Sequence, residues 1–117
     1  MTALELHAPA DPAQVDAEDL FVPASKDGDD VSGPPGYVLL FVRNRLKRKP
    51  RSVTVCWEPA GTHTLTVGPK QTLTIGPFGL TDLHGGIVLE DEINVSITYP
   101  VSRGLEVFAM KMAFLVS

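Results

Sequence analysis

Apolar residues alternate with threonine, serine or asparagine along much of residues 62–99. Leu65 and Val67 alternate with threonines, and so do Leu73 and Ile75. The run 93–99 keeps the same period of two, with asparagine, serine and threonine between its apolar residues. Successive side chains of a β-strand point to opposite faces, so this pattern predicts strands with one apolar face and one hydroxyl-rich face.

The other apolar segments extend the pattern to about seven strands without a substantial helix. The continuous apolar run 38–42 predicts a strand covered on both faces. Residues 63–67 and 71–75 predict a hairpin, and the proline-containing segment 43–51 predicts a second hairpin loop. Further strands are expected at 52–58, 87–89, 93–99 and 105–116, with a short helical turn at 80–84. The predicted fold class is all-β, a small antiparallel β-sandwich or barrel.

Two of these strands have informative faces. Val53, Val55 and Trp57 share one face of the strand at 52–58, and Cys56 lies on the other. The last strand is apolar on both faces, which predicts a central position in its sheet or contact of one face with another subunit. One of its faces carries Phe108, Met110, Met112 and Phe114, and the other carries Leu105, Val107 and Ala109.

Residues 1–36 differ in composition from the rest of the chain. They contain five prolines and three glycines, and residues 1–30 hold eight acidic residues against one lysine. This composition is typical of a solvated tail, or of an arm that becomes ordered against a partner. Short structure is expected only at Leu4 and Leu6, as a strand, and at 16–22, as a helical turn. We therefore predict an extended acidic, Pro/Gly-rich arm over 1–36, whose first 30 residues can be removed without unfolding a β-sandwich or barrel domain over 37–117.

The chain of 117 residues has the length of one domain with a single core. No apolar run approaches the ~20 residues of a membrane-spanning helix, so no membrane partner is expected. Residues 1–10 lack the basic and apolar regions of a secretory signal. Cys56 is the only cysteine, which excludes an internal disulfide and fits a reducing cytoplasm or a particle assembled there.

The sequence contains no motif of a catalytic, cofactor-binding or metal site. His7, His63 and His84 are far apart and lack the spacing of metal ligands. Cys56 has no neighbouring base to activate it, and neither a Gly-x-Ser-x-Gly elbow nor a phosphate-binding glycine loop occurs. The acidic run 90–92 lacks the spacing of a calcium loop. We therefore predict a protein that is not an enzyme and uses no cofactor.

The segment 43–51 holds six basic residues and no acidic one, although the whole chain has a net charge of −4. Three interpretations remain open. Contact with an acidic surface of another subunit, such as the arm of a neighbouring copy, ranks first, and a solvated loop ranks second. Nucleic-acid binding ranks last and is not expected, because the segment lacks aromatic side chains for base stacking and the protein is acidic.

Five segments, at 38–44, 52–55, 72–78, 95–99 and 105–107, follow one another in an order that resembles small head proteins of tailed bacteriophages. The most specific elements are Ile-Gly-Pro-Phe at the end of the third segment and Val-Ser-Ile-Thr-Tyr in the fourth. The phage proteins that the chain resembles act as minor capsid or decoration proteins. The resemblance implies a structural virion protein on the capsid surface, made in the host cytoplasm, that binds the major capsid protein and stabilises the head. It also implies further copies of the chain as partners, in a homo-oligomer such as a trimer.

Contacts with such partners are expected from the arm and from the basic segment. An arm can add as an extra strand to an exposed sheet edge, where main-chain donors and acceptors are available. The expected partner-binding residues are Leu4, Leu6, Leu20, Phe21, Arg43, Arg45, Lys47 and Arg48.

Two other functions are weighed against this hypothesis. A ligand-binding β-sandwich module, such as a carbohydrate-binding domain, would need exposed aromatic rings, for which Trp57, Tyr37 and Tyr99 are the candidates. A small hydrolase would need a pocket that joins Cys56 to His63 or His84, and nothing in the pattern predicts one.

Overall fold

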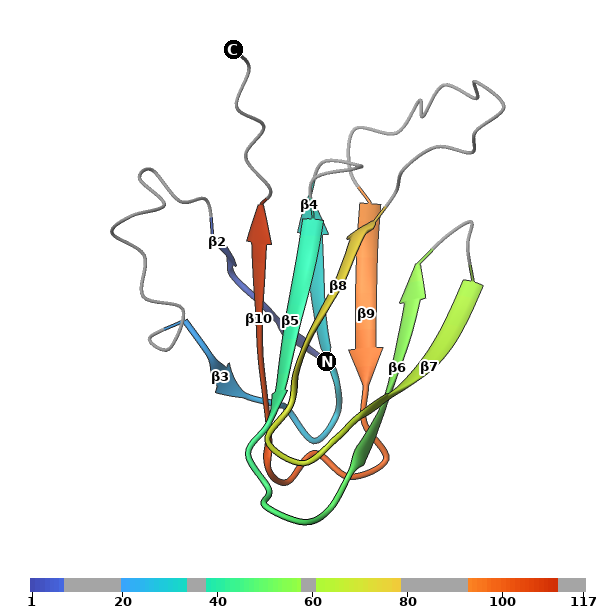
Figure 1. Cartoon of the computed structure of the whole chain (residues 1–117). Coiled ribbons are helices and arrows are strands. Elements are labelled where there is room, and N and C mark those ends of the chain that lie inside the picture. Colours follow the sequence, from blue (N-terminus) through green and yellow to red (C-terminus); the bar gives the residue numbers. More distant parts are fainter. Residues whose placement is uncertain (8–19, 34–37, 58–60, 79–92, 112–117) are drawn as a thin grey trace.

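The computed structural model describes residues 1–7, 20–33, 38–57, 61–78 and 93–111. These residues form two β-sheets packed face to face as a sandwich, and they contain neither a helix nor a closed barrel (Figure 1). The predicted all-β class and the sandwich are therefore confirmed, whereas the barrel is wrong because both sheets have open edges. Within the same ranges, no helix has the length and apolar character to cross a membrane.

The first sheet, sheet A, has five strands in the order β1-β4-β9-β6-β7. All neighbouring strands are antiparallel except β1, which runs parallel to β4, so the sheet is mixed. Its strands are β1 (Thr2–Ala3), β4 (Asp29–Gly33), β9 (Ile93–Thr98), β6 (Arg51–Trp57) and β7 (Gly61–Val67).

The second sheet, sheet B, has the order β2-β10-β5-β8, and β3 also pairs with β10. It too is mixed, because β2 runs parallel to β10 while the other pairs are antiparallel. Its strands are β2 (Leu6–His7), β3 (Val22–Pro23), β10 (Leu105–Lys111), β5 (Val38–Asn44) and β8 (Thr72–Phe78).

The inward faces of the two sheets form one core dominated by β-branched side chains, which pack well on a pleated surface. Val53 and Val55 of β6 are fully buried, as predicted, and Trp57 on the same face packs half-buried against them. Cys56 lies half-buried on the other face. The buried core residues are Val31, Val38, Leu40, Val42, Val53, Val55, Val67, Ile93, Val95, Ile97, Tyr99, Leu105, Val107 and Ala109.

Strand β10 is central, which is one of the two alternatives that its apolar faces predicted. It pairs with β5 on one side and with both β2 and β3 on the other. On the outer face of sheet B, the ring of Phe108 stacks on that of Phe41 with centroids 4.5 Å apart. Phe21, next to β3, packs edge-on against Phe108 at 4.6 Å, so the N-terminal segment covers this second apolar face.

Both predicted hairpins are wrong. Strands β5 and β6 lie in different sheets, and so do β7 and β8, so residues 45–50 and 68–71 connect one sheet to the other. Alternation determines which face of a strand is buried, but it does not determine the neighbouring strand. Sheets of a sandwich lie ~10 Å apart, a distance that even a four-residue connection can cross.

The predicted extended arm is also wrong for the described part of residues 1–33, which supplies strands β1 to β4. Strand β4 pairs along its whole length with β9, and Val31 is only 3% exposed. A Cβ atom at Gly33 would lie 2.7 Å from side-chain atoms of Leu6 and Val38, so a glycine allows the two sheets to approach here. Strand β4 was not predicted because Val31 is its only strongly apolar residue and the surrounding composition is acidic.

Some expectations lie outside the described residues. These are the helical turn at 80–84, the strand at 87–89, residues 16–19 of the expected N-terminal turn and residues 112–116 of the last strand. The described remainder of that N-terminal turn is not helical, since Val22 belongs to strand β3.

Candidate binding site at the basic end

Three loops meet at one end of the sandwich. They are residues 45–50 between β5 and β6, residues 68–71 between β7 and β8, and residues 99–104 between β9 and β10 (Figure 1). Main-chain hydrogen bonds connect them: Arg45 N donates to Gly104 O at 2.8 Å, and Lys70 N donates to Leu46 O at 3.0 Å. The three loops therefore form one surface, which we call the basic end.

The buried side chain of Asn44 holds the first loop in shape. Its Nδ2 donates to Lys49 O at 2.7 Å and to Val67 O at 3.1 Å. Its Oδ1 accepts a hydrogen bond from Leu46 N at 2.9 Å. A fully buried amide is stable only when its polar atoms are paired, and here the pairing joins the last residue of β5 to the first inter-sheet connection and to the last residue of β7.

Leu46 and Gly104 fix the contact between the first and third loops. Gly104 has a φ of 86°, a conformation that favours glycine. A Cβ atom at this position would lie 2.6 Å from Leu46 Cγ, so no larger residue fits without displacing the leucine. Leu46 is therefore half-buried against the third loop, whereas its basic neighbours are exposed to solvent.

Most of the positive charge of the chain is displayed at this end. Seven of the ten lysines and arginines are on or next to the three loops. All but Arg51 are exposed, and the guanidinium of that residue is held by a hydrogen bond of 3.1 Å from Nε to Arg103 O. The seven are Arg45, Lys47, Arg48, Lys49, Arg51, Lys70 and Arg103.

Glu106 is the acidic residue with described ion pairs to this region. It pairs with Arg43 at 2.8 Å on the outer face of sheet B. Arg45 Nε lies 3.6 Å from the same carboxylate oxygen, with the Arg45 side chain 66% exposed. One shared carboxylate cannot neutralise the basic end, so an excess of positive charge remains there among the residues that the structure describes.

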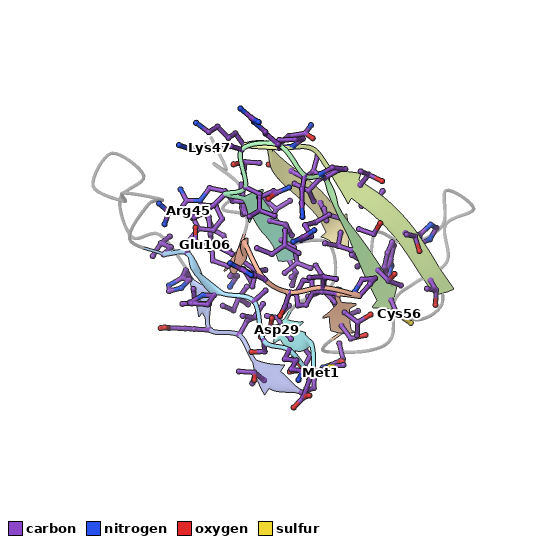
Figure 2. All side chains as sticks on the ribbon, turned by 90° about the horizontal axis from the view of Figure 1, so that it is seen from below. Met1, Asp29, Arg45, Lys47, Cys56 and Glu106 are labelled. Carbon is purple, nitrogen blue, oxygen red and sulfur yellow. The ribbon has the colours of Figure 1, made fainter. Side chains whose placement is uncertain are left out.

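The acidic turn before β4 lies apart from these bases. In the view from below, Lys47 and Arg45 lie toward one side of the molecule, and Asp29 and Met1 lie toward the opposite side (Figure 2). Asp27 in the same turn is exposed. Because the exposed Lys26 is next to Asp27 and Asp29 is buried, the turn itself presents no negative region that could balance the basic end.

The eight residues predicted to bind partners fall into two groups. Arg45, Lys47 and Arg48 are exposed at the basic end. The other five make contacts within the chain or are half-buried: Leu4 and Leu6 pack against the core, Leu20 is half-buried, Phe21 packs on Phe108, and the Arg43 guanidinium carbon lies 4.1 Å above the centre of the Phe21 ring.

Lys70 and Arg103 belong to the basic end, but the sequence analysis missed them. Each is an isolated base in a turn, about 20 and 50 residues beyond the basic segment. Only the two inter-sheet connections and the β9–β10 turn bring them beside Arg45 to Arg51. These two bases could have been assigned to the basic end only if the topology had already been known.

Of the residues considered for catalysis, Cys56 and His63 do not converge, and His84 lies outside the described residues. Cys56 pairs with Thr62 and His63 pairs with Val55, so the thiol and the imidazole lie on opposite faces of sheet A. The His63 ring packs against Trp57 at 5.1 Å, and His7 packs against Phe108 at 6.4 Å. No group of three His, Cys, Asp or Glu side chains that could hold a metal occurs among the residues that the structure describes.

The candidate aromatic platform for a sugar is likewise not assembled. Tyr99 is 7% exposed, and Trp57 is half-buried beside His63. Tyr37, the third candidate, lies outside the described residues. Comparison of the chain with protein-family models, with curated proteins and with solved structures gave no match.

Proposed function

We propose that this protein is a non-catalytic binding module that docks its basic end on an acidic protein surface. In keeping with the resemblance to phage head proteins, we propose the outer capsid lattice as that surface and a decoration or minor capsid role. The observation that carries the proposal is the set of seven bases that three interconnected loops display at one end of the sandwich.

The composition of the basic end favours a protein partner over a nucleic acid. Tyr99 is the single aromatic residue of the three loops, and its side chain is only 7% exposed, so the loops offer no exposed ring for base stacking. Apolar side chains are instead interspersed with the charges, and Val101 is 48% exposed. An apolar contact surrounded by charges is typical of protein interfaces, where the charges orient the encounter.

The hydrogen bonds of Asn44 add a second argument. Loops that are ordered before binding lose less conformational freedom when a partner arrives, so more of the contact energy appears as affinity. A small module with a preformed surface suits a lattice that offers many equivalent sites. Each bound copy stabilises the assembled state by mass action, because it binds the assembled shell and not its separated subunits.

Co-sedimentation with purified phage heads tests the proposal. We expect the wild-type chain to pellet with heads, and the double charge reversal Lys47→Glu/Arg48→Glu to bind about tenfold more weakly or worse. The matched control is Lys26→Glu/Lys111→Glu, which makes the same change in net charge at two exposed positions outside the basic end. The control should bind heads as the wild type does.

Equal binding by the two double variants would contradict the role of the basic end, and failure of the wild type to bind heads would contradict the capsid role. Added salt should weaken head binding, since exposed charges are screened within ~8 Å at physiological ionic strength. Binding of the wild type to duplex DNA but not to heads would replace the proposal with nucleic-acid recognition.

A further inference from the structure

The edges of the two sheets are protected to different degrees. An edge strand exposes unpaired main-chain groups, and proteins commonly protect it by shortness, proline, charge or a bulge. Strands β1, β2 and β3 are two residues long. Strand β8 contains Pro77, a Gly76 of φ 119°, and a register shift where it pairs with β5.

Strand β7, the remaining edge, has none of these protections. It spans seven residues and pairs in unbroken register with β6, from Arg51 opposite Val67 to Trp57 opposite Gly61. Its sequence, Gly-Thr-His-Thr-Leu-Thr-Val, contains no proline and no acidic or basic residue other than one histidine. Thr62, Thr64 and Thr66 are exposed, and no described strand lies beyond β7 in sheet A.

We propose that two copies of the chain associate through β7, which pairs antiparallel with itself about a two-fold axis at Thr64. In this register Thr62 lies opposite Thr66 of the second copy, and Thr64 lies opposite its own equivalent. All seven residues overlap, and the two A sheets become one continuous sheet of ten strands. Every second residue of β7 turns its main-chain N–H and C=O away from β6, and these groups supply the new hydrogen bonds.

The side chains of β7 select a second copy as the occupant, because the strand is complementary to itself. On the outer face the proposed register places only threonine opposite threonine, a favourable cross-strand pair. The same pair already exists within the chain, where the hydroxyl oxygens of Thr54 and Thr64 are 3.2 Å apart. On the inner face, His63 lies opposite Leu65 of the second copy. No like charges meet in this register. Self-association through the basic end would instead place the seven bases of one copy against those of the other.

Sedimentation velocity over a concentration series tests the pairing. The wild type should reach a mass of twice the 12.6 kDa chain, and Thr64→Lys and Thr64→Glu should each remain monomers. The two-fold axis places like charges directly opposite each other in either variant, whereas a mixture of the two places opposite charges there. The mixture should therefore form the dimer that neither variant forms alone. Thr74→Lys, an exposed change on edge strand β8, should dimerise as the wild type does.

A covalent test covers the case in which charged variants unfold. In a Cys56→Ser background, Thr64→Cys should form a disulfide between copies on oxidation, because directly opposed Cα atoms lie about 4.5–5.5 Å apart. Thr74→Cys in the same background should not. A monomeric or trimeric wild type, or a mixture that stays monomeric, would overturn the β7 pairing. None of these results alters head binding through the basic end, so the two proposals fail separately.

Discussion

Asp29 and Tyr99 form a buried polar pair where β4 begins. The Tyr99 hydroxyl donates to Asp29 Oδ2 at 2.7 Å, and Ser25 N donates to the same oxygen at 3.0 Å. Asp29 is 1% exposed, and its Oδ1 has no hydrogen-bond partner among the described residues. Burial raises the pKa of the Tyr99 hydroxyl far above its usual value, and the hydrogen bond and negative charge of Asp29 raise it further. The pair joins the first third of the chain to the β9–β10 turn.

Replacement of Tyr99 by phenylalanine should lower the free energy of unfolding by about 1–3 kcal/mol at neutral pH, because a buried carboxyl group loses a donor. The difference in the free energy of unfolding between the wild type and the variant should become smaller at high pH. The raised pKa keeps Tyr99 protonated in the folded state, while the unfolded state releases its proton above pH ~10. The wild type therefore loses stability relative to the variant there, by up to about 1.4 kcal/mol per pH unit. Urea unfolding of both proteins from pH 7 to 11 measures this. Parallel pH curves would show that Tyr99 does not titrate in this way.

Strand β4 shows how much the sequence of a single element could reveal. In Asp29–Gly33 the inward positions hold an aspartate, a valine and a glycine, so alternation of apolar residues is invisible. By contrast, Ile93–Thr98 alternates clearly, and its inward residues Ile93, Val95 and Ile97 are all buried as expected. Pattern reasoning succeeds where a strand supplies its own apolar face. It fails where a strand is stabilised mainly by its neighbours, as β4 is by β9.

Replacement of Val31 by alanine tests whether β4 is part of the core. We expect a loss of about 2 kcal/mol in the free energy of unfolding, since two buried methyl groups are removed and a cavity remains. Ser32→Ala, at the exposed neighbouring position, removes only the exposed hydrogen bond of 2.9 Å from Asn94 Nδ2 and should change it by less than about 1 kcal/mol. Chemical denaturation compares the two. Equal, negligible effects would restore the interpretation of residues 1–36 as an arm outside the fold, and with it the expectation that residues 1–30 are dispensable.

At the scale of the whole molecule, the candidate binding site is defined by where the charges lie and not by the net charge. The net charge of −4 would suggest an acidic surface, yet seven bases gather at one end. The sequence indicated the cluster in 43–51 because its members are contiguous. It could not indicate Lys70 and Arg103, because their proximity depends on loops that cross between sheets. The buried face of a strand can be predicted from its own sequence. The residues that meet on a surface made of several loops can be predicted only when the topology is known.

Repulsion among these bases should make stability depend on salt. In low salt, the variant Lys47→Ser/Arg48→Ser should unfold at a higher urea concentration than the wild type, because two members of a like-charged cluster are removed. The difference should disappear at about 0.5 M NaCl, where screening acts over only a few ångströms. Lys26→Ser/Lys111→Ser, with the same loss of charge elsewhere, should not show the low-salt gain. A gain of equal size in this control would mean that no cluster effect exists.

The pairing of early strands with late ones has a consequence for biosynthesis. Strands β2 and β3 pair with β10, β4 pairs with β9, and β1 reaches sheet A only through β4. Strands β2, β3 and β4 are therefore synthesised long before β9 and β10, and neither sheet can be completed until β9 and β10 have been made. Contacts this distant along the chain slow folding. During synthesis these three strands therefore lack their partners until residues 93–111 have emerged, and we expect the sandwich to form only after that point.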